Sequence, residues 1–246
     1  MNFFKKKKPI ETIDFKAPAH IAVIMDGNYR WSKSKNLPLK IGHKKGTENI
    51  EKIIDASIEF GTKYLTIYAF SSENWNRPKD EVEYLLALLD EYLDKEIKSL
   101  MAKGVRILIS GNLTRLSQKT RDKIKEIEEA TAKNEKFTLN VAFSYGARQE
   151  IVDAIKKIAL EVTENPSRID EIDEGLVAKN LYQPQVPDPD LMIRTAGDVR
   201  ISNFLLWQSA YTEFYFTDIL WPDFSKDDLK KAIIDFNQRI RKYGKR

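Results

Sequence analysis

Short apolar runs of strand length alternate with longer segments of helical period along nearly the whole chain. The short runs are rich in β-branched and aromatic residues, and the longer segments carry apolar residues three and four positions apart. Strands that alternate with helices in this way form a parallel sheet, because each helix carries the chain back to the edge where the previous strand began. The pattern therefore predicts an α/β fold: a single domain with a mainly parallel central sheet flanked by helices.

The same periodicity places the individual elements. We predict strands over residues 21–25, 64–70, 105–110, 137–144, 191–195 and 214–217. We predict helices over residues 42–60, 81–101, 117–133, 149–162 and 204–210. A last helix begins with a capping box formed by Ser225 and Asp228. The helix at 81–101 has an apolar face wider than one sheet contact needs, so it is either a central core helix or one wall of an apolar tunnel.

The composition limits the possible chemistry. The 246 residues include no cysteine and only two histidines, His20 and His43. Thiol nucleophiles, disulfides and zinc sites rich in Cys or His are therefore excluded. Lys and Arg outnumber Asp and Glu by 41 to 37, and the resulting net charge of +4 is too small to predict nucleic-acid binding. A chain of this length can bury a full core, and no repeat or linker divides it.

The amino terminus carries a basic run, Lys5–Lys8, without the apolar segment of a signal peptide, and no stretch has the length of a membrane span. We therefore expect a cytoplasmic protein, with residues 1–18 as a mobile basic tail and residues 19–246 as the folded domain. The tail is either simply solvated or in peripheral contact with the anionic inner face of the membrane, where each lysine adds about 1 kcal/mol.

The first candidate site follows the first predicted strand, because ligands of parallel α/β sheets bind beyond the carboxyl ends of the strands. Asp26, Gly27 and Asn28 stand there, and several cations follow within about two turns of helix. The carboxylate can hold a metal ion, Asn28 can accept a bond from a free amide, and the amides and cations can hold phosphate oxygens. The alternative is an ordinary helix capped by Asp26 or Asn28, with solvated lysines.

Arginines also follow the later strands, within residues 71–77, 145–148 and 194–202. The arginine fork suits phosphate oxygens, and the wide separation of these groups along the chain predicts two anions rather than one. The P-loop, the GxGxxG turn and the GxSxG elbow are absent from the sequence. What remains is magnesium and diphosphate beside an apolar cavity, a combination that fits an isoprenoid substrate.

Several segments resemble the cis-prenyltransferases, the isoprenyl transferase family whose best-known member is undecaprenyl diphosphate synthase. They are HIAVIMDGNYRW from His20, the helix that contains His43, YAFSSENWNRP from Tyr68, SYGARQEI from Ser144, and the run from Pro189 to Phe224. The resemblance covers nearly the whole chain from Ala19. It implies a catalytic domain over residues 19–246, with an apolar tunnel, that assembles as a homodimer.

The resemblance implies repeated condensation of isopentenyl diphosphate onto an allylic diphosphate such as farnesyl diphosphate, with Mg2+ as cofactor and a new cis double bond in each cycle. The product would be a polyprenyl diphosphate, the precursor of the undecaprenyl carrier lipid of the cell wall. A short- or medium-chain product is one alternative. A non-catalytic partner subunit of a heteromeric prenyltransferase is the other, but such a subunit should have lost Asp26 or the group Arg194, Arg200 and Ser202, which this chain keeps.

The resemblance also assigns roles to individual residues. Asp26 and Asn74 would be catalytic. Asp26 and Glu213 would bind the metal ion, and Glu213 would lie near the partner subunit. Gly27, Asn28, Arg30 and His43 would bind the allylic diphosphate, and Arg194, Arg200 and Ser202 the isopentenyl diphosphate. The loop from Ser71 to Arg77, with Ser71, Ser72, Glu73, Trp75 and Arg77, would close over the site. Tyr29, Trp31 and Ile201 are further substrate-binding candidates. Taken singly, each of these residues could instead be a cap, a loop anchor or part of a structural ion pair.

Six positions depart from the family pattern. Tyr29, Ala147 and Ala196 stand in place of glycines, Leu39 in place of a basic residue, Ser144 in place of asparagine, and Asp198 in place of glutamate. Lys40 can replace the charge that is missing at Leu39. The departures bear on affinity for the allylic substrate more than on the type of reaction.

One hypothesis goes beyond the family. Alternation along the strand at 137–144 puts Phe137 and Phe143 on one face. If that face meets the apolar side of the helix at 81–101, the growing chain runs between them, and one of the two rings helps to set its final length. The alternative is that both rings are plain core.

Overall fold

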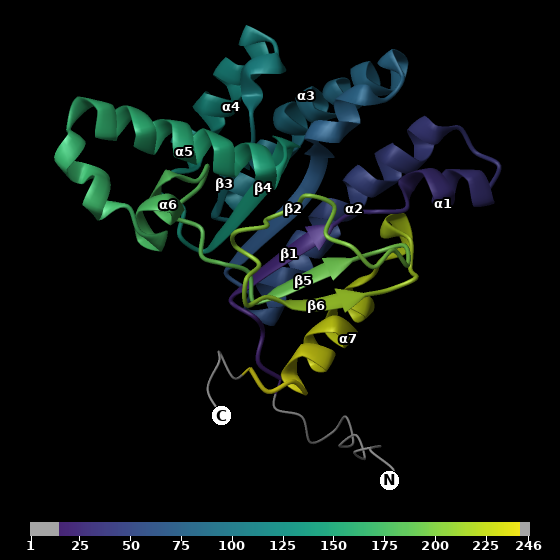
Figure 1. Cartoon of the computed structure of the whole chain (residues 1–246). Coiled ribbons are helices and arrows are strands. Elements are labelled where there is room, and N and C mark those ends of the chain that lie inside the picture. The colour runs from purple at the N-terminus through teal and green to yellow at the C-terminus, as the bar shows by residue number, and fades with distance from the viewer. Residues whose placement is uncertain (1–14, 242–246) are drawn as a thin grey trace.

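The computed structural model describes residues 15–241, apart from the side chains of Glu96 and Ile97. Its centre is one sheet of six parallel strands in the order β3-β4-β2-β1-β5-β6 (Figure 1). The strands are β1 (His20–Ile24), β2 (Tyr64–Ser71), β3 (Val105–Ser110), β4 (Phe137–Tyr145), β5 (Leu191–Arg194) and β6 (Glu213–Phe216). The predicted α/β fold is confirmed. The basic run Lys5–Lys8 lies outside the described residues.

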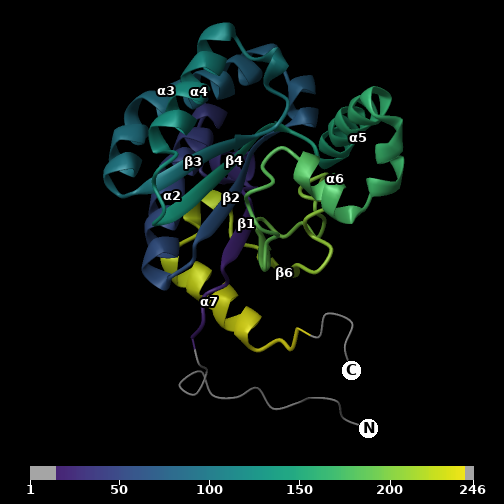
Figure 2. The same cartoon turned by 90° about the vertical axis from the view of Figure 1, so that its left-hand side faces the viewer.

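Helices cover both faces of the sheet. On one face lie α2 (Leu39–Phe60), α3 (Lys79–Ala102), α4 (Gln118–Thr131) and α7 (Lys226–Asn237), and on the other lie α5 (Ala147–Glu164) and α6 (Glu174–Asn180) (Figure 1, Figure 2). The short α1 (Asn28–Ser34) packs against α2. None of the helices in the described part of the chain combines the length and the apolar composition that crossing a bilayer requires.

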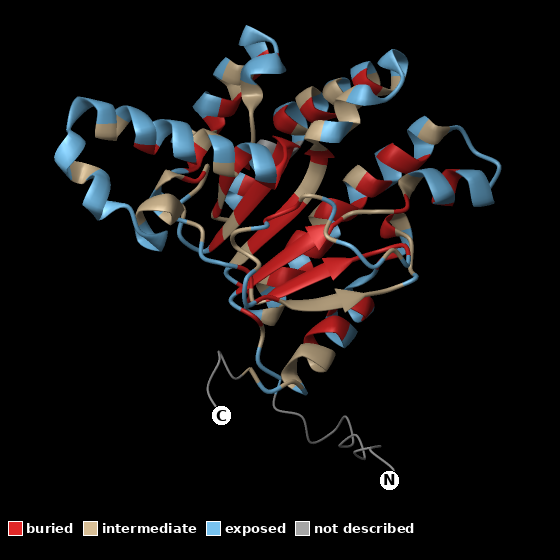
Figure 3. Cartoon of the chain, in the orientation of Figure 1, coloured by how far each residue is buried: buried red, intermediate tan, exposed pale blue. Residues whose placement is uncertain are grey.

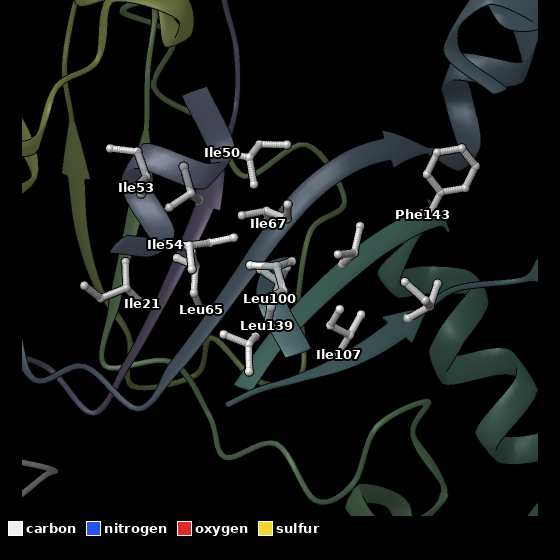
Figure 4. Packing of buried hydrophobic residues seen from close by; sticks show 14 of the residues in the cluster. Ile21, Ile50, Ile53, Ile54, Leu65, Ile67, Leu100, Ile107, Leu139 and Phe143 are labelled. Carbon is white, nitrogen blue, oxygen red and sulfur yellow. The ribbon is translucent and has the colours of Figure 1, made fainter. Parts of the chain in front are cut away.

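The larger core fills the space between the sheet and α2, α3, α4 and α7. Ile53 and Ile54 of α2 and Leu100 of α3 are fully enclosed against Ile21 of β1 and Leu65 of β2 (Figure 4). Each such side chain contributes about 1.5–3 kcal/mol through the apolar surface it removes from water. This core fixes the central strands, and with them the position of every residue that follows a strand.

A smaller core of aromatic rings lies on the other face. Tyr68 stacks on Phe204 with 4.4 Å between ring centroids, and Tyr145 meets both rings edge-on. Burial is greatest in the central strands, whereas the edge strand β6 is half-buried (Figure 3). The more buried strands of the sheet therefore include those that carry the candidate site.

Two local predictions are wrong. Residues 204–210 form successive turns rather than a helix, because Asn203 and Leu205 have φ values of 61° and 46°, which a right-handed helix excludes. Asn28 does not cap α1: the N-cap is Gly27, with φ of 109°, and Asn28 is the first helical residue. Glycine adopts this left-handed conformation without the steric cost that Asn or Asp would carry.

The packing of α1 on α2 depends on two glycines of α2. A Cβ atom at Gly42 would lie 2.3 Å from both the carbonyl oxygen of Asn28 and Oγ of Ser32. A Cβ atom at Gly46 would lie 2.4 Å from Oδ1 of Asn28. Distances this short are repulsive, so α1 lies this close to α2 only because both positions lack a side chain.

Replacing Gly42 by alanine should destabilise the protein, although alanine in a helix interior is normally about 1 kcal/mol better than glycine. The new methyl group forces α1 away from α2 at a cost of about 3 kcal/mol, the upper part of the usual range, because both of its contacts would lie at 2.3 Å. Urea unfolding followed by circular dichroism measures the change. Lys52→Ala, at an exposed position of the same helix, is the control, and a Gly42→Ala protein as stable as the wild type would contradict the close packing.

Candidate active site

An open polar cavity of about 720 Å³ lies beyond the carboxyl ends of β1, β2 and β5. Its walls are the segments that follow these three strands, as expected for a parallel sheet. His43 of α2 and Leu85 of α3 complete the lining. The fold therefore joins segments from distant parts of the sequence into one site.

Arg194, the last residue of β5, is the central side chain of this cavity. Its guanidinium donates to Oδ2 of Asp26 at 2.8 Å, and to Oγ of Ser202 and the carbonyl oxygen of Arg200 at 2.6 Å each. Only 4% of Arg194 is exposed, so these bonds replace the water that the buried charge has lost. Because β1 and β5 are adjacent, with Ile24 paired to Arg194, the sheet itself sets the Asp26–Arg194 contact.

Asp198 lies among three arginines. Its Oδ2 accepts bonds from Arg200 at 2.9 Å and from Arg30 at 3.2 Å, and lies 3.7 Å from Nη2 of Arg194. Desolvation favours the neutral acid, but the charges of Arg200, Arg30 and Arg194 outweigh it and lower the pKa of Asp198. The carboxylate occupies a point where three guanidinium groups converge, which is an arrangement suited to phosphate oxygens.

Two of the positions that we expected to differ from the related family have positive φ. The φ of Ala196 is 73° and that of Ser144 is 52°. Glycine and asparagine adopt such values more readily than alanine or serine. Both residues support the site: the carbonyl of Ala196 accepts from Arg30 at 2.5 Å, and Oγ of Ser144 accepts from Nε1 of Trp75 at 2.9 Å. The guanidinium of Arg115 lies over the Trp75 ring, 4.2 Å from its centroid.

The 3₁₀ turn Ser72–Asn76 forms the wall after β2. Oγ of Ser71 accepts from the amide of Asn74 at 3.2 Å, and Oδ1 of Asn74 accepts from the amide of Ser71 at 3.1 Å. This reciprocal cap fixes the start of the turn. Glu73 accepts from Nδ2 of Asn203 at 2.8 Å, which ties the turn to the segment that follows β5.

His43 and Arg77 both lie beside Glu81 of α3. Nε2 of His43 is 3.5 Å from Oε1 of Glu81, and Nη1 of Arg77 donates to the same oxygen at 2.8 Å. Burial lowers the pKa of His43; the Glu81 carboxylate opposes this shift, and Arg77 adds to it. Among the described residues Nε2 of His43 has no hydrogen-bond partner, so this buried nitrogen at the cavity wall is placed to bind a ligand oxygen.

An apolar cavity of about 80 Å³ adjoins the polar one, between the sheet and the helices α2 and α3. The two cavities share the lining residues Met25, Asn28, His43, Ala69 and Leu85. A third cavity of about 150 Å³ between α2 and α3 shares Thr47, Leu88 and Tyr92 with the apolar one. The wide apolar face of α3 therefore serves both as core and as a cavity wall, and the structure shows a small apolar cavity where the sequence predicts a tunnel.

The polar cavity brings most of the sequence-predicted site residues together. Its lining includes Asp26, Gly27, Asn28, Tyr29, Arg30, His43, Ser71, Glu73, Asn74, Arg77, Arg194, Arg200 and Ser202. Trp31, Ser72, Trp75 and Ile201 are not part of this lining. The Trp31 indole donates to Oδ1 of Asp223 at 2.8 Å, and Ile201 packs on the smaller core.

Glu213 lies at the other end of the sheet from Asp26. It opens β6 and pairs with Leu191 at the start of β5, whereas Arg194 at the end of β5 pairs with Phe216. Its carboxylate accepts from Arg239 at 2.9 Å. The fold of one chain therefore does not bring the two predicted metal ligands, Asp26 and Glu213, together.

Three residues of the site were not among those predicted from the sequence: Tyr68, Glu81 and Asn203. Tyr68 lines the polar cavity from β2, and its hydroxyl donates to the carbonyl of Tyr145 at 3.1 Å. Alternation along the strand could have found Tyr68, and the spacing of four between Arg77 and Glu81 is the usual signal of a helical ion pair. For Asn203, the sequence holds no signal beyond its position next to Ser202.

Comparisons with known proteins agree with this geometry. The family model described as "Putative undecaprenyl diphosphate synthase" matches residues 24–244. An isoprenyl transferase of Streptococcus agalactiae serotype III (strain NEM316) is 47% identical over 248 residues, which cover 99% of each chain. An isoprenyl transferase of Thermotoga maritima is 46% identical over 227 residues, which cover 92% of this chain and 97% of the relative.

Solved structures show the same relationship. Lavandulyl diphosphate synthase from Lavandula x intermedia, in complex with dimethylallyl diphosphate, is 37% identical with a TM-score of 0.90 over 93% of this chain and 99% of the other. A probable undecaprenyl diphosphate synthase from Campylobacter jejuni is 37% identical with a TM-score of 0.77, over the same shares. Fold and site together define a prenyltransferase. The chain belongs to the undecaprenyl diphosphate synthase family of isoprenyl transferases.

Replacing Glu81 by glutamine should move the titration midpoint of His43 to lower pH. The Glu81 carboxylate raises the pKa of His43, and glutamine removes that charge while keeping the shape of the side chain. NMR of protein labelled at histidine can follow the change because there are only two histidines. His20 is distinguished from His43 because burial lowers its pKa to about 4.

Arg77→Met is the control, because it should shift the pKa of His43 in the opposite direction. Arg77 lowers the pKa of His43, so its loss should move the His43 midpoint to higher pH. Identical midpoints in the wild type and both variants would show that these three side chains do not interact in solution.

Proposed function

We propose that this chain is a Mg2+-dependent cis-prenyltransferase that condenses isopentenyl diphosphate repeatedly onto an allylic diphosphate such as farnesyl diphosphate. The product is a polyprenyl diphosphate, the undecaprenyl precursor of a cell-wall carrier lipid. The proposal rests mainly on the convergence of Arg30, Arg194 and Arg200 in a polar cavity that adjoins an apolar one. Such a site matches a substrate with a diphosphate head and a hydrocarbon tail.

The cavity residues fit a magnesium ion held jointly by protein and substrate. In the described part of the chain no cluster of three or more His, Cys, Asp or Glu side chains could bind a metal without further ligands. Asp26 supplies a carboxylate at the cavity wall, and Mg2+ commonly uses one or two carboxylates together with substrate phosphates and water. When bound, the ion supplies positive charge to the departing diphosphate.

In the proposed reaction, the bond between the allylic carbon and its diphosphate oxygen breaks and the double bond of isopentenyl diphosphate attacks that carbon. A proton then leaves, and the new cis double bond forms. Arg30 and His43 bind the allylic diphosphate, whose negative charge grows as the bond breaks, and Arg77 belongs to the loop that closes over it. Arg194, Arg200 and Ser202 bind the diphosphate of the attacking substrate.

Asn74 supports both steps from the turn that closes the cavity. Its Oδ1 is engaged by the amide of Ser71, which leaves its NH2 group as the donor toward a substrate oxygen. An amide side chain is not a base at neutral pH, so Asn74 orients the substrate while the proton leaves.

A homodimer is part of the proposal. Val152, Ile155 and Leu160 of α5 are 43%, 54% and 67% exposed, and they give this covering helix an apolar surface. A second copy of the chain would remove that surface from water.

Replacing Asp26 by alanine or asparagine should lower turnover by about 10³-fold or more, because magnesium and the Arg194 guanidinium both lose their carboxylate. Incorporation of labelled isopentenyl diphosphate into a farnesyl starter measures the activity. Circular dichroism must show a folded protein, since Arg194 loses a buried partner. Asp122→Ala, at an exposed position of α4, should keep full activity.

Two outcomes would overturn the proposed reaction: near-normal activity of the Asp26 variants, and full activity in excess EDTA. A folded wild-type protein that binds isopentenyl diphosphate but shows no condensation with any allylic starter would instead support the non-catalytic subunit.

Replacing Phe143 by alanine should lengthen the product. Phe143 lines the apolar cavity opposite Leu85 and Leu89 of α3, whereas Phe137 is 1% exposed and is not part of that lining. Removing the Phe143 ring enlarges the space for the growing chain. Mass spectrometry of the products measures the effect.

Phe137→Ala is the matched control, with the same change of side chain in the same strand. It should cost about 3–5 kcal/mol of stability and leave the product length unchanged. Wild-type product lengths from a folded, active Phe143→Ala protein would end the hypothesis.

A further inference from the structure

The corner where α1 joins α2 concentrates positive charge. Between Asp26 and Glu48 the chain carries six Lys or Arg residues and no Asp or Glu. The whole chain has a net charge of +4, so all other residues together carry a net charge of −2. The mild overall charge therefore hides one strongly basic segment of the chain.

Exposed apolar side chains lie among these cations. Leu37 is 40% exposed and Ile41 is 38% exposed, and Pro38 between them is exposed as well. The cations around them that are exposed are Lys33, Lys35, Lys40, Lys44 and Lys45. We refer to the exposed residues from Lys33 to Lys45 as the lysine corner.

The candidate active site does not use this charge. Arg30 is the cation of this stretch that lines the polar cavity, and Lys45 pairs with Glu48 at 2.6 Å. Within residues 15–241, no carboxylate oxygen that the structure describes lies within 4 Å of the amino groups of Lys33, Lys35, Lys40 or Lys44. Lys35 lies over the Trp31 ring and Lys40 over the Tyr84 ring, contacts that leave their charge uncompensated.

The lysine corner lies at the junction of α1 and α2, whose close packing fixes its position. It projects beyond the carboxyl end of β1, beside the sheet (Figure 1). The close approach of α1 to Gly42 and Gly46 holds it in place. Arg30, which precedes the corner in the chain, lines the polar cavity, and Lys44 lines the cavity between α2 and α3 together with Glu48 and Glu91.

We propose that the lysine corner docks on an anionic lipid bilayer, with Leu37 and Ile41 inserted at the level of the acyl chains and the lysines among the headgroups. Lysines attract anionic headgroups, and apolar side chains framed by lysines are typical of segments that lie in the membrane interface. Nucleic acid fits less well, because it offers no apolar partner to the exposed Leu37 and Ile41. Docking requires neither substrate nor turnover and so goes beyond the proposed function.

Insertion can be tested with a single fluorescent label, because the chain has no cysteine. Leu37→Cys or Ile41→Cys, each carrying an environment-sensitive fluorophore, should shift to the blue with vesicles of phosphatidylcholine and phosphatidylglycerol. The shift should be absent with pure phosphatidylcholine. Lys125→Cys on α4, an exposed position outside the corner, is the control and should not shift.

Vesicle co-sedimentation tests the role of charge. The triple variant Lys33→Gln, Lys35→Gln, Lys40→Gln removes three lysines without a carboxylate partner and should bind anionic vesicles about a hundredfold more weakly, since each lysine near an anionic leaflet contributes about fivefold. The matched variant Lys119→Gln, Lys125→Gln, Lys133→Gln carries the same change of net charge at exposed positions in or next to α4 and should bind as the wild type does. Circular dichroism confirms that each variant is folded.

A third full-length variant, with Lys5 to Lys8 replaced by glutamine, separates the corner from the amino terminus. The proposal is overturned if this variant alone abolishes binding while the corner variant binds normally. It is also overturned if the wild type does not bind anionic vesicles, or if binding occurs without a blue shift at positions 37 and 41. That last result would indicate a surface that recognises polyanions by charge alone.

Discussion

The ion pair between Arg194 and Asp26 is the interaction on which the rest of the site depends. Arg194 is almost fully buried, and an uncompensated charge in that environment costs several kcal/mol. Adjacent parallel strands bring the two carboxyl ends together, so the pair forms at the sheet itself rather than through a flexible loop. Arg200 and Ser202 are then held by the same guanidinium, and the position of the whole segment after β5 follows from it.

Carboxylates hold the arginines of the cavity in place. Asp198 contacts Arg30 and Arg200, and Glu81 contacts Arg77. Without these acids, several like charges would repel one another and lose their fixed positions. A diphosphate carries more negative charge than a single carboxylate and can take over these contacts, so the acids keep the site assembled while leaving it open to a stronger anion.

The two adjoining cavities separate the two parts of an isoprenoid diphosphate. The polar cavity is lined by the segments that follow β1, β2 and β5, whereas the apolar one lies between β2, β4 and the helices α2 and α3. They meet at Met25, Asn28 and His43. Under the proposed function, desolvation of the charged groups would keep a hydrocarbon tail out of the polar side and the apolar side would accept it, which would orient the substrate without a specific contact to each of its carbons.

Apolar periodicity predicted the strands, most helices and the residues that follow each strand, because it is a local property and the carboxyl ends of parallel strands meet at one edge. Asp26 follows one strand closely and Arg194 ends another, which was enough to assign both residues to one site. That Asp198 lies among three arginines and that Glu81 faces His43 became visible only in the folded chain, since these contacts join elements with no local pattern in common. Residues 204–210 have helical periodicity but do not form a helix. Phe204 stacks on Tyr68 instead, and Asn203 and Leu205 have positive φ, which a right-handed helix does not allow.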